Sequence, residues 1–340
     1  MDARVATQRG AASVAVAVIS YNTRDILRDC LRTVVANAPA RIVVADNGST
    51  DGSIDMVRGE FPDALLLVDE RNPGYGAAAN SAVAACDTPY VLLLNSDTLL
   101  PAGSLAPLAS YMDEHPRVAM AGPRLRHGDG SLHRSAYAFP STTFLIVEQS
   151  PLRAAARWIP AMRHRYFIDW AHDEARAVPW VYGAALMLRR TAFEEVGGYD
   201  PSFYMYYEEV DLAYRLARAG WETHYAPVAE VTHLGGASTS RVWATMKERN
   251  FRSLIRFAAT HMSATEATRL AATLRALVAA KAAIASAHQL LVRDPARRRA
   301  AREDAAFWRH LARVPFVREA ALLRAGRSTD LGASSRAARL

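Results

Sequence analysis

An apolar run that ends on three polar residues constrains the fold of this chain more than any other stretch. Residues 90–94 read Tyr-Val-Leu-Leu-Leu and are followed by Asn95, Ser96 and Asp97. Five apolar residues are too few for a buried helix but fit a strand covered on both faces, as central strands of parallel sheets are. Ligands of open α/β sheets bind where such strands end. We therefore expect Asp97 at a ligand site, although Asn, Ser and Asp also begin ordinary turns.

Strands and helices are predicted to alternate through the first 120 residues. Short apolar runs predict strands at 14–19, 41–45, 65–68 and 90–94, with helices beginning near residues 25, 53 and 77. Such an order forms right-handed βαβ units and a mostly parallel sheet flanked by helices. Because the carboxyl ends of parallel strands share one edge, we expect one crevice there, lined by residues 20–22, 46–47 and 95–97.

Beyond residue 118 the pattern changes. A strand is predicted at 118–121 and a tight turn at 127–130, and the long irregular region to about residue 179 is more typical of a functional flap than of a simple connection. A strand at 180–188, helices from 191 and over 208–218, and strand segments near 224 and 232 complete the main body. Ala- and Arg-rich helices are expected after Ser263, which begins a capping box with Glu266.

Composition is typical of a globular protein from a reducing compartment. The chain has 340 residues, 51% of them hydrophobic, and its two cysteines form no CxxC pair. We expect no disulfide and no signal peptide, because the first ten residues lack an apolar core. No run reaches about 18 uncharged apolar residues, so no membrane-spanning segment is expected. These features predict a cytoplasmic protein.

Charge is distributed unevenly along the chain. Residues 1–240 carry 21 Lys and Arg against 27 Asp and Glu, a net charge of −6, whereas residues 241–340 carry 20 against 7, a net charge of +13. A basic end of this kind suits an anionic partner, either nucleic acid or a lipid surface, and a merely solvated arginine-rich surface is the alternative. The acidic body disfavours a nucleic-acid-binding protein.

The predicted crevice has the chemistry to hold a nucleotide. Asp46 can accept hydrogen bonds from a base or ribose, Tyr21 offers a flat face, and Asp97 can ligate a divalent cation that bridges a diphosphate. The sequence has no GxxxxGK[ST] phosphate loop, so a metal is needed to neutralise the phosphates. Gly74-Tyr75-Gly76 resembles part of GxGxxG, but a dinucleotide-dependent oxidoreductase carries that motif in its first βα turn, which has no glycine here.

Seven short motifs follow one another between residues 14 and 240. They are Ser20-Tyr21-Asn22, residues 46–53, residues 71–76 with Asn80, Asn95-Ser96-Asp97, Gly183-Ala184, residues 208–212 with Arg215, and His233. This series resembles family 2 glycosyltransferases of the GT-A fold, and most of all their rhamnosyltransferase-like branch. The last 100 residues are outside the resemblance.

The resemblance implies inverting transfer of a sugar from a nucleoside-diphosphate donor, with dTDP-rhamnose favoured and a UDP-sugar as the alternative. The metal, Mg²⁺ or Mn²⁺, is then held by Asp97 and His233, with Asn95 in place of the first Asp of the family's DxD motif. A lone histidine near a strand end is otherwise more often simply hydrogen-bonded. The implied donor-binding residues are Ser20, Tyr21, Asn22, Asp46, Asn47, Arg71, Asn72, Gly76, Asn80, Asn95 and Ser96.

Inversion in a single displacement needs a base beside the acceptor hydroxyl. By resemblance Glu209 is this base, and Glu208 and Asp211 orient it or bind the acceptor. Asp211 has equal reason to form an ion pair with Arg215, four residues on. The candidate acceptor-binding residues are Trp180, Tyr182, Gly183 and Ala184. The alternative is that they belong to the core, as aromatic residues on a strand more often do.

The expected acceptor is a glycan or a polyprenyl-diphosphate-linked sugar in cell-envelope polysaccharide synthesis. We expect a catalytic domain over 13–240, with a nucleotide-binding half (13–117) and an acceptor half (118–240). A basic helical extension over 241–325 suits the inner face of the cell membrane, with packing on the catalytic domain or another subunit as the alternative. Residues 1–12 and 326–340 are expected to be disordered. A non-catalytic glycosyltransferase-like binding protein and a nucleotidyltransferase are the other functions left open.

Overall fold

The computed structural model describes residues 13–150, 152–167, 170–235 and 243–326, and the chain divides into two compact units. The first unit comprises residues 1–139 with 164–243, and the second comprises 140–163 with 244–340. The segments expected to be disordered, 1–12 and all but the first residue of 326–340, lie outside the described residues.

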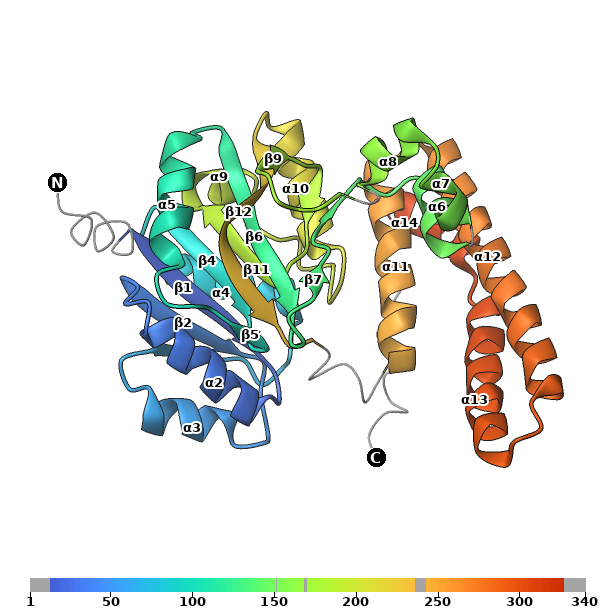
Figure 1. Cartoon of the computed structure of the whole chain (residues 1–340), viewed down its shortest axis with the longest axis horizontal. Helices are drawn as coiled ribbons and strands as arrows, with labels where there is room; N and C mark the ends of the chain where they lie inside the picture. The colour runs from blue at the N-terminus through green and yellow to red at the C-terminus, as the bar shows by residue number, and fades with distance from the viewer. Residues whose placement is uncertain (1–12, 151, 168–169, 236–242, 327–340) are drawn as a thin grey trace. The chain divides into compact units, whose positions relative to one another are not determined.

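A parallel sheet forms the first half of the first unit (Figure 1). Strand β1 (Val14–Ser20) pairs in parallel with β2 (Arg41–Asp46) on one side and β4 (Tyr90–Asn95) on the other, and β3 (Leu65–Val68) extends the sheet beside β2. The helices between these strands are α2 (Arg24–Val35), α3 (Ser53–Glu60) and α4 (Tyr75–Ala84). The predicted alternation is confirmed, with α4 beginning two residues earlier than expected.

The second half of the sheet mixes strand directions. Strand β11 (Ala185–Arg189) lies antiparallel to β4 and to β6 (Val118–His127), while β12 (Glu222–His233) runs parallel to β6. Strand β5 (Thr98–Leu99) pairs antiparallel with the end of β12. The full order is β3-β2-β1-β4-β11-β6-β12-β5. The short strand β7 (Leu132–His133) pairs with β6, and β9 (Arg176–Ala177) pairs with β12. The remaining helices are α5 (Leu105–Glu114), α9 (Arg190–Glu195) and α10 (Glu208–Arg218).

The prediction of one strand over 180–188 was wrong. Strand β10 (Trp180–Val181) pairs with β8 (Ala136–Tyr137) in a separate small sheet, and the chain leaves it at Gly183 before β11 begins. The two strands are covered by different neighbours, but both are apolar. Hydrophobicity alone therefore does not show where one ends and the next begins.

The irregular region predicted up to residue 179 contains three short helices. They are α6 (Thr142–Gln149), α7 (Leu152–Ala156) and α8 (Pro160–Tyr166). The side chain of Ser141 accepts a hydrogen bond from the N–H of Phe144 and so caps α6. Pro160 is the first residue of α8, a position where proline is favoured.

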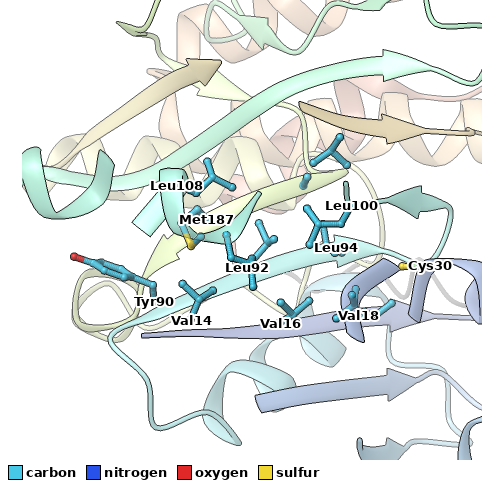
Figure 2. Packing of buried hydrophobic residues seen from close by; sticks show 14 of the residues in the cluster. Val14, Val16, Val18, Cys30, Tyr90, Leu92, Leu94, Leu100, Leu108 and Met187 are labelled. Atoms are coloured by element: carbon cyan, nitrogen blue, oxygen red, sulfur yellow. The ribbon is translucent and has the colours of Figure 1, made fainter. Parts of the chain in front are cut away.

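Both faces of the central strands are buried, as a double-sided core requires. Val14, Val16 and Val18 of β1 pack with Leu92 and Leu94 of β4 in one cluster (Figure 2). Their neighbours in sequence, such as Ala15, Ala17 and Leu93, belong to a second cluster on the opposite face. Successive side chains of a strand alternate between faces, so a strand buried on both sides must be continuously apolar.

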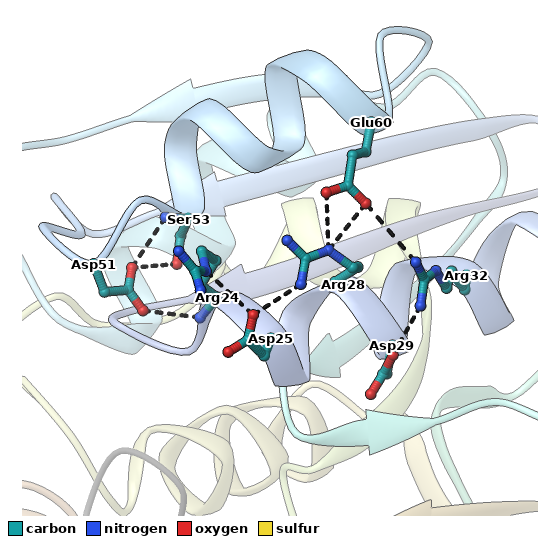
Figure 3. A network of polar contacts seen from close by, with 8 residues as sticks. All are labelled: Arg24, Asp25, Arg28, Asp29, Arg32, Asp51, Ser53 and Glu60. Carbon is teal, nitrogen blue, oxygen red and sulfur yellow. Dashed lines mark hydrogen bonds and ion pairs between the residues drawn. The ribbon is translucent and has the colours of Figure 1, made fainter.

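Polar contacts tie the loops after β1 and β2 to each other (Figure 3). Asp51 accepts hydrogen bonds from the backbone N–H of Arg24, at the start of α2, and of Ser53, at the start of α3. Arg28 of α2 donates to both carboxylate oxygens of Glu60 at 2.9 Å. Exposed ion pairs of this kind stabilise a fold by less than about 1 kcal/mol each. Their consequence is therefore local: they fix the two loops that border the predicted crevice.

The second unit is helical. It contains α11 (Trp243–His261), α12 (Ala264–Leu291), α13 (Pro295–Ala312) and α14 (Phe316–Arg324), and the predicted capping box of Ser263 and Glu266 is present at the start of α12. Residues 140–163, expected within the acceptor half, belong to this unit instead. Helix α6 packs on α12, and Lys281 donates to the side chain of Gln149 at 3.0 Å. The sequence did not predict this pairing, because the two partners are more than 100 residues apart.

Helix α12 meets the length and composition of a membrane-spanning helix, against expectation. An 18-residue window within it has a mean hydropathy of 1.5, and 33% of that window is buried in the protein. The expectation required uncharged residues, whereas α12 includes Arg275 and Lys281. Since core helices of soluble proteins have the same composition, this observation by itself assigns no membrane span.

Candidate active site

Asp97 and His233 meet at one edge of the sheet. Asp97 follows β4 directly, and Thr98 of β5 pairs with His233 at the end of β12. The N–H of Leu234 donates to the backbone carbonyl of Asp97 at 2.8 Å. Through this pairing, Oδ1 of Asp97 lies 3.2 Å from Nε2 of His233, with both residues less than a tenth exposed.

The donor atoms of this pair fit a divalent cation. Two ligands that bind one ion at about 2.1 Å and at right angles are about 3 Å apart, close to the separation seen here. Oδ1 of Asn95 is also buried and has no hydrogen-bond partner within the described residues. In the part of the chain that the structure describes, no cluster of three His, Cys, Asp or Glu side chains forms a complete metal site. An ion held here therefore needs further ligands from a bound molecule or water.

On the nucleotide side, Asp46 and Asn22 shape the loop that follows β2. The carboxylate of Asp46 accepts from the N–H and the hydroxyl of Ser49, both at 2.7 Å. Asn22, with a φ of +52°, donates its N–H to the Ser49 hydroxyl and accepts from the N–H of Thr50, both at 2.8 Å. Its left-handed conformation suits Asn better than most residues. Tyr21 follows the last residue of β1 and precedes Asn22. It is 42% exposed, so its ring is accessible to a ligand.

Hydroxyl groups bridge the ends of β1 and β4. Thr23 donates to the hydroxyl of Ser96 at 2.8 Å and lies 3.3 Å from that of Ser20. Asn47 is buried, and its Oδ1 lacks a partner in the described part of the chain. Polar atoms left buried and unpartnered cost free energy unless a ligand or water reaches them, which indicates binding capacity on this rim.

The predicted donor-binding side chains of Arg71 and Asn80 have partners within the protein, and Asn72 is held by its backbone. Arg71, 85% exposed at its side chain, forms a bidentate ion pair with Asp69 at 2.7 and 2.9 Å. Asn80 exchanges two hydrogen bonds of 2.8 Å with the backbone of Tyr199. Asn72 has a φ of +50° and forms a turn back to Asp69. The structure therefore gives Asn80 an architectural part, in which its amide holds the Tyr199 segment.

Gly74 and Gly76 allow the start of α4 to approach the segment before α10. A Cβ atom on Gly74, whose φ is +98°, would lie 2.9 Å from backbone carbon atoms of Tyr204, and one on Gly76 would lie 3.1 Å from Cβ of Tyr199. The N–H of Tyr75 donates to the carbonyl of Tyr204 at 3.1 Å. Glycine is required at Gly74 because both the backbone angle and the space exclude a side chain.

Glu208 and Glu209 begin α10, and of the two residues Glu208 is buried and Glu209 is half-buried. Burial raises the pKa of Glu209 to about 7, even though the N–H of Gly183 hydrogen bonds to its carboxylate. Burial and the charge of Glu209 raise the pKa of Glu208. One oxygen of each carboxylate, Oε2, has no hydrogen-bond partner in the described ranges. A buried carboxylate with a free oxygen and a pKa near 7 is suited to accept a proton at neutral pH.

The two acidic centres face the same phenol. Burial raises the pKa of Tyr182, and the charges of Glu209 and Asp97 both add to the effect. The ring of Tyr182 also lies 5.7 Å from that of His233, centroid to centroid. Tyr182 is followed by Gly183, whose N–H hydrogen bonds to Glu209, so Glu209 and the Asp97–His233 pair border one site.

Asp211, by contrast, is held in an ion pair. It is 1% exposed, and Arg215 donates to its Oδ2 from two nitrogens at 2.8 and 2.7 Å. Arg215 also donates to the carbonyls of Val196 and Gly198 at 2.7 and 2.6 Å. The ion-pair alternative for Asp211 is therefore present, and it fastens α10 to the turn after α9.

The candidate acceptor residues separate into two groups. Tyr182 and Gly183 lie at the site, next to His233 and Glu209. Trp180 stacks on Tyr137 and donates its indole N–H to the carbonyl of Ala138, and Ala184 is fully buried. These last two positions have the character of core residues, the alternative given for aromatics on a strand.

Sequence reasoning missed His133. Its Nδ1 lies 3.4 Å from Nδ1 of His233, and burial followed by the neighbouring His233 and His127 lowers its pKa to about 4. It belongs to β7, a strand of two residues, and no motif or periodicity marks it. Only its pairing with β6 brings it to the site.

Comparison with known proteins identifies the family. The model of "Glycosyltransferase like family 2" matches residues 11–253. The chain belongs to glycosyltransferase family 2. The N-acetylglucosaminyl-diphospho-decaprenol L-rhamnosyltransferase of Mycobacterium tuberculosis is 33% identical over 279 residues, covering 78% of this chain and 88% of the relative. Rhamnosyltransferase WbbL of Escherichia coli is 26% identical, covering 65% and 83%.

Solved structures of low sequence identity share the fold. Mannosyltransferase PcManGT of Pyrobaculum calidifontis, in complex with GDP-Man and Mn²⁺, superposes with a TM-score of 0.53 at 18% identity over 93% of this chain and 88% of that one. GalNAc-T7 with UDP, GalNAc and Mn²⁺ gives 0.50 at 15% identity, covering 73% and 51%. The predicted GT-A fold is confirmed, and this family 2 glycosyltransferase is an enzyme of the rhamnosyltransferase-like branch.

The ion pair of Asp211 and Arg215 yields a stability prediction. Arg215→Met should lower the free energy of unfolding by about 3–5 kcal/mol, because it leaves a carboxylate buried without a cation. Arg299→Met is the matched control, since Arg299 and Glu303 have the same four-residue spacing but are 85% and 68% exposed. The control should change stability by less than about 0.5 kcal/mol. Urea unfolding measures both, and equal effects would contradict an anchoring part for Asp211.

Proposed function

We propose that this enzyme transfers L-rhamnose from dTDP-rhamnose to an N-acetylglucosamine carried on a polyprenyl diphosphate, with inversion at the anomeric carbon. The observation that carries the proposal is the 3.2 Å approach of Asp97 to His233 beside the buried carboxylate of Glu209. The name of the Mycobacterium tuberculosis relative supports the sugar and the acceptor. A UDP-sugar donor is the alternative.

In this proposal Asp97 and His233 hold Mg²⁺ or Mn²⁺, as the Mn²⁺ in the two structural relatives supports. When bound, the ion neutralises the diphosphate as negative charge develops on the leaving group. Asn95 contributes its free Oδ1 on the same rim. The nucleoside end lies along residues 20–22 and 46–47. There Asp46 faces the base, and the ring of Tyr21 faces the flat surface of the base.

Glu209 is the proposed general base. It takes the proton of the acceptor hydroxyl while the oxygen forms its bond to the anomeric carbon and the bond from that carbon to the diphosphate breaks. The N–H of Gly183 holds one side of the carboxylate, and Oε2 is left to accept the proton. Tyr182 lies between the base and the metal pair and is the proposed contact for the acceptor sugar.

A transfer assay tests this function. The enzyme is incubated with dTDP-rhamnose, UDP-sugars or GDP-mannose and a short-chain GlcNAc-diphosphate lipid, with Mg²⁺, Mn²⁺ or EDTA. We expect transfer from dTDP-rhamnose only in the presence of metal, and a loss of at least about 100-fold in Asp97→Ala and His233→Ala, because each removes a ligand. Asp55→Ala, an exposed carboxylate of α3, is the control. Transfer that persists in EDTA, or in Asp97→Ala, would refute the metal pair.

The raised pKa of Glu209 predicts the pH dependence of catalysis. Below its pKa of about 7 the carboxyl is protonated and cannot act as a base, so kcat/KM should fall tenfold per pH unit on the acid side and level off above it. Glu209→Gln should lose about 10²–10⁴-fold at pH 8. Glu208→Gln is the matched control and should keep the acid limb. A limb that vanishes in Glu208→Gln instead would assign the base to the other glutamate.

We further propose that the second unit lies on an anionic membrane surface, where a lipid-linked acceptor is found. Ile284, Leu290 and Leu291 of α12 are 69%, 74% and 77% exposed. Arg293 and residues 297–299 beside them are exposed as well. Lys281, Leu270 and Leu274 of the same helix are not part of this surface, because Lys281 is hydrogen-bonded to Gln149 and the two leucines are buried.

Vesicle binding tests the surface. The protein should co-sediment with vesicles containing anionic lipid at low salt and be released by high salt, since surface charges are screened. Replacing Arg297, Arg298 and Arg299 with Gln should weaken binding about 100-fold, at about 1 kcal/mol per basic residue. Arg58→Gln, an exposed arginine of the first unit, is the control. Equal binding to neutral vesicles, or none at low salt, would end the proposal.

A further inference from the structure

A second histidine lies behind the Asp97–His233 pair. Nδ1 of His133 is 3.4 Å from Nδ1 of His233, and the two rings are nearly parallel, 8° apart with centroids at 5.3 Å. The other nitrogen of His233, Nε2, faces Asp97 at 3.2 Å. Both ring nitrogens of His233 therefore have a partner. Nε2 contacts Asp97, which follows β4, and Nδ1 contacts His133 of β7.

The protons on these rings are constrained. A neutral imidazole carries one proton, on either Nδ1 or Nε2. When Nε2 of His233 ligates a cation, it must offer its lone pair, so the proton of His233 is on Nδ1. That N–H points at Nδ1 of His133. Two N–H groups cannot face each other at this distance, so Nδ1 of His133 must then be the acceptor.

We infer that His133 is a positioning residue for the metal site: it accepts the Nδ1–H of His233 and keeps the Nε2 lone pair directed at the cation. This inference rests on the proposed binding of a metal by Asp97 and His233. Metal-ligating histidines are commonly oriented by a partner on their other nitrogen, and loss of that partner lowers metal affinity by about 10–100-fold.

The surroundings of His133 hold its ring in place for this task. His127 stacks on it at 4.3 Å and 19°, and Tyr182 lies 5.0 Å away, centroid to centroid. Without a metal the same contact also serves the opposite arrangement, in which His133 donates to Nδ1 of His233 and Nε2–H of His233 donates to Asp97. A histidine can do both because it exchanges donor and acceptor between tautomers, which a carbonyl or a lysine cannot.

Mn²⁺ affinity in the presence of a nucleoside diphosphate, measured by electron paramagnetic resonance, tests the inference on the full chain. His133→Phe removes the acceptor and should weaken Mn²⁺ binding about 10–100-fold. His133→Asn places an amide oxygen near the former Nδ1 and should stay within about threefold of the wild type. His288→Phe, the same exchange at an exposed histidine of α12, is the control and should bind like the wild type.

A second measurement reports the proton directly. Nitrogen-15 NMR of the histidine side chains with Mg²⁺ bound should show His233 protonated at Nδ1 in the wild type and in His133→Asn, and a mixture of tautomers in His133→Phe. Thermal unfolding of each variant establishes that it is folded.

The outcomes separate this inference from the proposed function. Unchanged Mn²⁺ affinity in His133→Phe, with binding abolished in Asp97→Ala, overturns the part of His133 alone. Equal losses in His133→Asn and His133→Phe also overturn it, because shape and not hydrogen bonding would then be responsible. A wild-type protein that binds no Mn²⁺ overturns the metal site and the inference together.

Discussion

The site depends on one short backbone pairing, that of Thr98 and Leu99 with the last residues of β12. Asp97 follows β4, the last strand of the parallel half, whereas His233 ends β12, which joins the sheet much later in the chain. The hydrogen bonds of this two-residue strand bring the carboxylate of Asp97 and the imidazole of His233 within 3.2 Å of each other. The buried, double-sided core beneath them makes the pairing rigid, because strands covered on both faces have little room to shift.

The carboxylates of Glu209 and Asp211 lie within a single turn of α10 but have different neighbours. Asp211 is buried against Arg215, so its charge is compensated and its atoms are occupied. Glu209 hydrogen bonds to the N–H of Gly183 and has no cation as a partner among the described residues, so burial of its carboxylate disfavours the charged form and raises its pKa. The same helix turn therefore supplies an anchor and a group able to exchange a proton, and three acidic residues that look alike in sequence are physically distinct.

Glycosyltransferase activity follows from family membership, and the finer assignments rest on the chemistry of the rim. Asp97 and His233 have the spacing of two ligands, and the amide oxygens of Asn95 and Asn47 and one carboxylate oxygen of Glu209 have no partner among the described residues. Together these groups suit a charged donor on one side and a hydroxyl acceptor on the other. His133 shows that the site extends past the residues that touch a substrate.

Sequence by itself determined the parallel half of the fold, because a strand buried on both faces must be a continuous apolar run and its polar end must be a loop. It also determined the family, through motifs whose order survives along 220 residues. The sequence did not predict the short elements, because two to eight residues are too few to show a periodicity. These elements are the helices at 142–166, the two strands within 180–189 and the strand that contains His133. Only the tertiary structure decided which polar residues meet a ligand and which serve the fold, as with Asn80 on Tyr199 and Asp211 on Arg215. The reason is physical: the part a side chain plays is set by the burial and the partners it has in space, and those come from segments far away in the chain.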